Sequence, residues 1–136
     1  MKYAGMAAGI AGLAVLTACM QAGTMPEPEE GRRLFVQNCV QCHGPAGKGD
    51  GPLSRGMKPR PTDLTQLQVG AVFPRARVLS TIDGYHRAKI PGEVMPEFGA
   101  LLEGETVPVQ TEDGIMTPTP RPLAALLAYL EAIQGS

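Results

Sequence analysis

Apolar side chains near the end of the chain recur with the period of an amphipathic α-helix. The leucines fall at positions i, i+3, i+4 and i+7, namely Leu123, Leu126, Leu127 and Leu130. This spacing places them on one helical face and predicts a helix over about residues 120–134. Thr119 is suited to cap its N-terminus, Pro120 to begin it, and Gly135 to end it.

A second helix is predicted from Pro28 to about Asn38. Pro28 suits the first helical position, and Glu29 and Glu30 follow where the helix dipole favours negative charge. The predicted helix ends beside Cys39. One of its faces carries Gly31, Leu34, Phe35 and Asn38.

The middle of the chain is rich in turn-forming residues. A shorter helix is predicted over about residues 74–85, and residues 58–67 indicate an extended, proline-rich crossing. No convincing alternation of apolar and polar residues marks a strand. The expected fold class is therefore mostly α, with three to four helices joined by long loops. Residues 100–118 predict either a small hairpin or an Ω-like loop.

The first 18 residues have the pattern of a processing signal. Their uncharged run has the length of a signal-peptide core and is too short to span a membrane. The run ends in Leu16-Thr17-Ala18-Cys19, which resembles the lipobox of bacterial lipoproteins, where the chain is cut before a cysteine that becomes acylated. We expect a signal peptide over residues 1–18, a lipidated Cys19 and a tether over residues 19–27. A plain secretory signal with an incidental cysteine is the alternative.

The composition indicates a small domain that lacks the bulk for an ordinary core. The 136 residues include three Phe and three Tyr, no Trp, 17 glycines and 13 prolines. A domain of this size has difficulty burying enough apolar area to offset its conformational entropy, so we expect a group outside the polypeptide to complete the core. The balance of 13 acidic and 12 basic residues argues against a nucleic-acid-binding protein, which is usually clearly basic.

The strongest chemical signal is Cys39-Val40-Gln41-Cys42-His43, which matches the C-x-x-C-H motif for attachment of c-type haem. Two thiols three positions apart can each add to one haem vinyl group, and the histidine that follows is held below the iron as a nitrogen ligand. The alternatives are a redox disulfide, a zinc site and a structural disulfide. They lack, respectively, a βαβ context, further ligands and a use for His43.

From about residue 28 to its end, the chain resembles a class I c-type cytochrome. Beyond the pentapeptide, Gly51-Pro52-Leu53 is similar to the turn that follows the attachment site in that family. The resemblance implies a cytochrome c domain over residues 28–136 with one haem c, bound covalently through Cys39 and Cys42.

The same resemblance implies how His43 is oriented. In the family a proline carbonyl accepts a hydrogen bond from the ligand imidazole. Transferred to this chain, the Pro52 carbonyl would accept from His43 Nδ1 and leave Nε2 for the iron. A plain surface turn at Pro52 is the alternative.

The sixth iron ligand implied by the resemblance is Met95. The segment Met95-Pro96-Glu97-Phe98 looks like the ligand loop of the family, and a thioether suits iron that cycles between two oxidation states. A residue before proline favours extended backbone, and glycines at positions 92 and 99 allow the loop to bend. The other candidates are Met57, Met116 and His86, of which His86 is interpreted as a surface or supporting residue.

The family also implies how the helices pack. Its first and last helices cross near a glycine and an aromatic residue, a role here for Gly31 and Phe35 against Leu126 and Tyr129. Leu64 and Leu67 are expected to pack on the haem. The stretch over residues 100–118 is an insertion relative to the shortest family members.

Bases and acids occupy different parts of the chain. Bases concentrate in residues 48–60 and 75–89, whereas residues 92–120 hold six acids and no base. This separation suggests a dipolar molecule that orients as it docks on a redox partner. An ordinary solvated surface is the alternative.

These features predict a monohaem electron carrier, and not an enzyme, on the periplasmic face of a bacterial membrane. Cys19 would anchor it, and without acylation of Cys19 it would be soluble in the periplasm. The expected partners are a quinol-oxidising complex, a terminal oxidase or a periplasmic dehydrogenase, of which it would be a carrier or a bound subunit, and no nucleic acid. The rivals are a haem enzyme or gas sensor with a displaceable Met95, and a haem-free metal-binding or redox-thiol lipoprotein.

Overall fold

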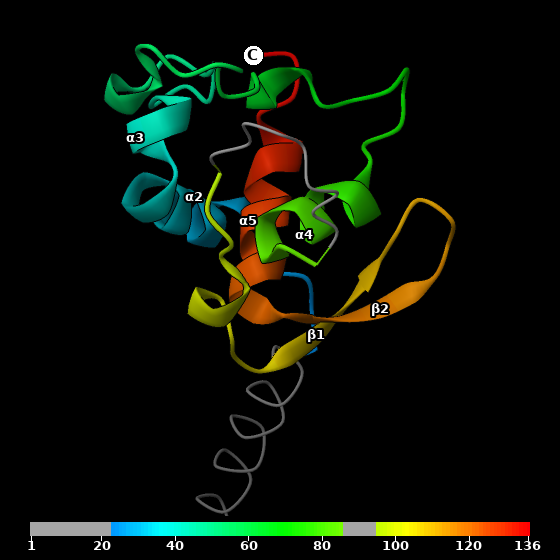
Figure 1. Cartoon of the computed structure of the whole chain (residues 1–136). Helices are drawn as coiled ribbons and strands as arrows, with labels where there is room; N and C mark the ends of the chain where they lie inside the picture. The colour runs from blue at the N-terminus through cyan, green and yellow to red at the C-terminus, as the bar shows by residue number, and fades with distance from the viewer. Residues whose placement is uncertain (1–22, 86–94) are drawn as a thin grey trace, which may run out of the picture.

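A computed structural model describes residues 23–85 and 95–136. They form helices α2 (Pro28–Asn38), α3 (Val40–His43), α4 (Arg75–Asp83) and α5 (Arg121–Ala132), and a hairpin of strands β1 (Thr106–Gln110) and β2 (Met116–Pro120). Short 3₁₀ turns lie at Pro52–Ser54, Leu64–Gln66 and Gly99–Leu101. Figure 1 shows α5 running through the centre, with α2 and α3 to its left and the hairpin leaving its lower end. The mostly helical fold class is confirmed.

Helices α2 and α5 cross at Gly31. This glycine is buried, and a Cβ added to it would collide with the backbone carbonyl of Ala125 and lie 2.8 Å from the Cβ of Tyr129. One turn further along α2, Phe35 packs on Tyr129 with ring centroids 5.1 Å apart and an interplanar angle of 49°. Leu126 is buried in the same core. The crossing expected from the family resemblance is therefore present, and it depends on the absence of a side chain at Gly31.

The stretch before α5 is a hairpin, so of the two alternatives for residues 100–118 the hairpin is confirmed and the Ω-like loop is wrong. β1 alternates exposed and buried residues, and Val107 and Val109 are each 1% exposed. Both valines belong to the core that also contains the buried leucines of α5. The period-two burial of β1 is typical of a strand with one face on a core.

Prolines obscure this hairpin in the sequence, because proline is rare in strands. Along an antiparallel ladder, facing residue pairs alternate between hydrogen-bonded and non-hydrogen-bonded pairs. The bond from Arg121 N to Glu105 O (2.7 Å) marks that pair as hydrogen-bonded, and with it every second pair along β1 and β2. In the register of β1 and β2, Pro108, Pro118 and Pro120 all belong to non-hydrogen-bonded pairs. The prolines therefore remove no ladder bond, and they leave the outer edges short of donors that could pair with another chain.

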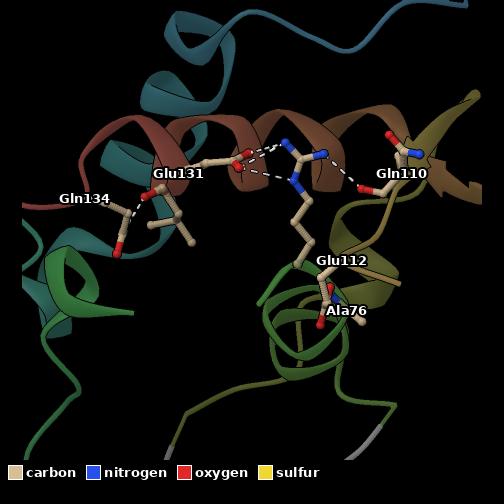
Figure 2. A network of polar contacts seen from close by, with 7 residues as sticks. Ala76, Gln110, Glu112, Glu131 and Gln134 are labelled. Atoms are coloured by element: carbon tan, nitrogen blue, oxygen red, sulfur yellow. Dashed lines mark hydrogen bonds and ion pairs between the residues drawn. The ribbon is translucent and has the colours of Figure 1, made fainter. Parts of the chain in front are cut away.

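A polar network joins the hairpin to α4 and α5 (Figure 2). The guanidinium of Arg75 pairs with Glu131 (2.8 Å) and donates to the carbonyl oxygen of Gln110 (2.9 Å). The backbone N–H of Ala76 donates to the carboxylate of Glu112 (3.0 Å), so a hairpin side chain caps the start of α4. Because the paired side chains of Arg75 and Glu131 are each 32% exposed, this ion pair fixes geometry more than it adds stability.

The predicted cap of the last helix, Thr119, is wrong. α5 begins at Arg121 after Pro120, and no side chain caps it. Thr119 belongs to β2, where its hydroxyl donates to the carbonyl of Thr117 (3.1 Å). Strand pairing holds Thr119 away from the helix end, and an ion pair of Arg121 with Glu30 on α2 (2.9 Å) secures the first turn of α5.

The N-terminal features of the sequence are only partly within the described ranges. The signal segment over residues 1–18 and Cys19 lie outside them. Residues 23–27 have no regular secondary structure, but Met25 packs against the core and Pro26 is buried. Within the described residues, no helix is long and apolar enough to cross a membrane.

Replacement of Gly31 tests the helix crossing. We expect Gly31→Val to lower the free energy of unfolding by about 2–3 kcal/mol, because the added side chain meets backbone that cannot yield. Urea denaturation of the haem-loaded chain measures this. Gly23→Val, at a position with no atom within 4 Å of the added Cβ, is the matched control. Equal stability of the two variants would contradict the close crossing.

Candidate cofactor site

A cavity of about 600 Å³ lies between α3, α4, the segment after α3 and the Met95–Phe98 segment. Its volume is in the range of cofactor and ligand pockets. The side chains predicted to touch a cofactor all line it, namely Cys39, Cys42, His43, Leu64, Leu67 and Met95. A second hollow of about 230 Å³ lies beside the Arg75–Glu131 ion pair and holds no thiol or imidazole, so the first cavity is the candidate site.

The pentapeptide reaches the cavity through a break between two helices. α2 ends at Asn38, and Cys39 links it to the single turn of α3. His43 N donates to Cys39 O (2.9 Å), which closes this turn and brings both cysteines and the histidine to the cavity wall. Gly44 then ends α3 with a φ of 77°, a value that favours glycine.

Cys39 has the character of an unreactive thiol. Cys39 and Cys42 are not joined to each other in the structure. Burial, with a smaller contribution from Cys42, raises the pKa of Cys39 to about 11. Redox-active cysteines have lowered thiol pKa values instead, which disfavours the redox-disulfide interpretation. Within the described residues no group of three or more His, Cys, Asp and Glu side chains could hold a metal ion.

The imidazole of His43 is held by a backbone carbonyl. The ring is 8% exposed, and its Nδ1 lies 3.0 Å from the carbonyl oxygen of Thr62. Burial lowers the pKa of His43 below its ordinary value, against a smaller opposite effect of the Thr62 bond. A neutral ring that donates from Nδ1 keeps a lone pair on Nε2 for a metal.

The expected role of Pro52 is wrong, because Thr62 supplies the carbonyl that Pro52 was expected to supply. Pro52 is exposed and begins a 3₁₀ turn. The preceding Gly51 explains the position of that turn: its N–H donates to Cys42 O (3.1 Å), and a Cβ there would lie 2.5 Å from the carbonyl oxygen of Gln41. The Gly-Pro turn therefore packs under α3 and does not orient the imidazole.

The segment that carries Met95 is tied to α4. Phe98 N donates to Ile82 O (3.0 Å). A Cβ on Gly84, which follows α4 with a φ of 95°, would lie 2.5 Å from the Cγ of Glu97. Gly99 likewise packs on Asp83. This glycine was expected to allow the loop to bend, and in the structure it allows the loop to pass close to the end of α4.

The structure separates the candidates for the sixth ligand only in part. Met95 and Met57 both line the cavity. Met116 lies on the hairpin and is 54% exposed, outside the cavity wall. His86 and Gly92 lie outside the described residues.

Comparison with known proteins agrees with this geometry. The profile of the family described as Cytochrome c matches residues 28–134, and the chain belongs to that family. No curated protein matches the sequence. A solved structure with a similar fold is a chain of the reducing HAO-like protein complex of Kuenenia stuttgartiensis, with a TM-score of 0.54 and 24% sequence identity. The similarity covers 82% of this chain and 44% of that one, so this chain corresponds to less than half of its neighbour.

Family membership implies a covalently bound haem c, and the residues present fit it. The two thiols stand two residues apart before a histidine, in an apolar cavity of suitable volume. The Nδ1–Thr62 bond leaves the other imidazole nitrogen available. Residue types alone indicated the cysteines and His43, whereas no side chain signals the Thr62 carbonyl.

Removal of both attachment thiols tests the covalent bond. We expect wild-type protein from a host that matures c-type cytochromes to keep its haem mass and colour after denaturation, and Cys39→Ser/Cys42→Ser to lose both. Mass spectrometry of the denatured chains measures this. Cys19→Ser is the control and should keep the haem. An unmodified polypeptide mass for the wild type would contradict the assignment.

Proposed function

We propose that this protein carries single electrons, and that His43 and Met95 would bind the iron of one haem c. One observation carries the proposal: the attachment cysteines, His43 and Met95 all line the same apolar cavity. The Nδ1 atom of His43 is already hydrogen-bonded there. When bound, the haem supplies a one-electron couple, and a methionine opposite a histidine raises its potential.

The protein's own residues keep the site rigid. Backbone bonds hold the His43 ring at Thr62 and the Met95 segment at α4 through Phe98. Groups held in one geometry in both oxidation states need little rearrangement when an electron moves. No residue of the cavity has to make or break a substrate bond in this role.

Electrons would pass at the exposed rim of the cavity. Leu53 lines the cavity and is 56% exposed, which gives an apolar contact area at its mouth. Exposed bases lie in the same part of the chain, namely Lys48, Arg55, Lys58 and Arg60. The exposed acids of the hairpin region include Glu103, Glu105, Glu112 and Asp113. This distribution fits docking of the basic side on an acidic redox partner, such as a quinol-oxidising complex, a terminal oxidase or a periplasmic dehydrogenase.

A second candidate is a cytochrome subunit of a larger oxidoreductase. The solved structure with the similar fold is part of a complex, and its chain is more than twice as long as the region that matches. The chemistry assigned to His43 and Met95 is the same in both proposals.

We also propose that the chain is exported and anchored to a bacterial membrane by acylation of Cys19. The support is the sequence Leu16-Thr17-Ala18-Cys19 after an uncharged run, and the odd number of three cysteines, of which the haem site uses two. Two or more acyl chains anchor a protein stably where one does not.

The ligand role of Met95 can be tested by absorption spectroscopy. We expect Met95→Ala to lose the sulfur-to-ferric charge-transfer band and to bind carbon monoxide rapidly when reduced, because the sixth position is then open. Met57→Ala, in the same cavity, and Met116→Ala, outside it, should retain the band. Loss of the band in Met57→Ala alone would move the ligand to Met57. Rapid carbon monoxide binding by the reduced wild type would favour the gas sensor or enzyme.

The anchor can be tested by fractionation. We expect wild-type protein to sediment with membranes and to enter the detergent phase, and Cys19→Ser to remain in the aqueous fraction with its haem attached. Immunoblots of the fractions and intact mass measure this. Equal partition of the two proteins would remove the lipid anchor and leave the haem assignment unaffected.

A further inference from the structure

The side-chain amide of Gln134 joins the end of the chain to a distant segment. Gln134 lies just beyond the last residue of α5 (Figure 2). Its Oε1 accepts hydrogen bonds from the backbone N–H groups of Leu67 (2.8 Å) and Gln68 (3.3 Å). Its Nε2 donates to the carbonyl oxygens of Leu64 (2.8 Å) and Leu130 (2.6 Å). A primary amide has two N–H donors and two acceptor lone pairs, so this side chain uses all of its hydrogen-bonding capacity.

The orientation of the amide is fixed by its surroundings. The groups at Oε1 are both N–H donors and the groups at Nε2 are both carbonyls, so the reversed amide would place like groups together. The carbonyl of Leu130 is one of those at the end of α5 that a helix leaves unpaired. Gln134 therefore connects the end of α5 with residues 64–68 in one geometry.

The connected segment is a wall of the cofactor cavity. Leu64 and Leu67 both line the cavity, and they lie at the two ends of one 3₁₀ turn. Gln134 binds the first through its carbonyl oxygen and the second through its N–H. The backbone N–H of Gly135 adds a bond to the carbonyl oxygen of Thr65, between the two leucines (2.9 Å). The end of the chain thus holds the whole turn.

The shape of this turn is determined locally, whereas its place is not. The carboxylate of Asp63 accepts hydrogen bonds from the backbone N–H (2.9 Å) and the hydroxyl (2.7 Å) of Thr65. These bonds join residues of the turn to each other and close it. The hydrogen bonds that place the turn against α5 are those of Gln134 and Gly135.

The turn in turn sets the place of the carbonyl that orients His43. Thr62, whose carbonyl oxygen meets Nδ1 of His43, stands two residues before Leu64. We infer that Gln134 is a positioning residue for the His43 side of the haem. It holds the turn against α5, so that the Thr62 carbonyl and the apolar wall keep their places while the charge on the metal changes. The inference rests on the proposed function.

Hydrogen exchange of the His43 Nδ1–H proton, followed by NMR on the reduced, haem-loaded chain, tests this role. A proton held by the Thr62 carbonyl exchanges with water only when that bond opens. We expect Gln134→Met, which keeps the side-chain length and lacks the amide, to speed this exchange about tenfold, because several hydrogen bonds of the turn are lost. The backbone N–H of Leu126, buried at the helix crossing, reports global unfolding and should change less.

Gln134→Glu separates the two halves of the amide, and it decides the question if Gln134→Met does not yield haem-loaded protein. A carboxylate keeps both acceptor atoms and loses both donors. The carbonyl oxygens of Leu64 and Leu130 would then face a negative charge. We therefore expect Gln134→Glu to speed the exchange of the His43 proton at pH 7 as well.

Gln68→Met is the matched control. Gln68 is exposed on the same segment, and Gln134 binds its backbone N–H and not its side chain. This variant should leave the exchange unchanged. The inference is overturned if the Gln134 variants behave like Gln68→Met, or if the His43 and Leu126 protons accelerate equally. Either result leaves a covalently attached haem and the proposed function in place, whereas a wild-type chain without covalent haem would overturn the proposed function itself.

Discussion

The close crossing of α2 and α5 is the constraint on which the cofactor cavity depends. The backbones touch at Gly31, and Phe35 packs on Tyr129 one turn later. The same two helices supply cavity wall through Phe35 and Leu126, and α2 leads directly to the attachment cysteines. Because packed interiors do not deform continuously, a wider crossing would displace the wall and the attachment point together. Two of the six aromatic residues, Phe35 and Tyr129, lie at this crossing.

Backbone bonds, more than side-chain contacts, organise the proximal side of the cavity. The Thr62 carbonyl orients the imidazole of His43, and the bond from Leu64 N to Gly47 O attaches the same segment to the loop after α3. The segment therefore reaches the cavity in a fixed position and brings Leu64 with it. Such an arrangement suits an electron carrier, whose ligands have to stay in place while the charge on the metal changes.

The hairpin acts on the site through α4 and through α5, with which its strands are in contact. Its strands pack against the buried side of the core, and none of their residues lines the cavity. Gln110 and Glu112 nevertheless bind the first residues of α4 at Arg75 and Ala76. Because α4 supplies cavity wall and receives the Met95 segment at Ile82, the insertion helps to position the distal side without touching it.

Sequence alone determined those parts of the site that are formed by residues close together in the chain. The C-x-x-C-H pentapeptide is contiguous, and the helices before and after it carry their own periodicity, so Cys39, Cys42 and His43 could be assigned from residue types. The hairpin could be offered only as one of two alternatives, because its alternation is interrupted by prolines, which are harmless only in the register that pairing selects. Only the tertiary structure decided that Thr62, and not Pro52, meets the imidazole, since every residue carries the same carbonyl. It also joined Gln134 to Leu64 and Leu67, because contacts between distant segments depend on how the backbone packs and not on residue type.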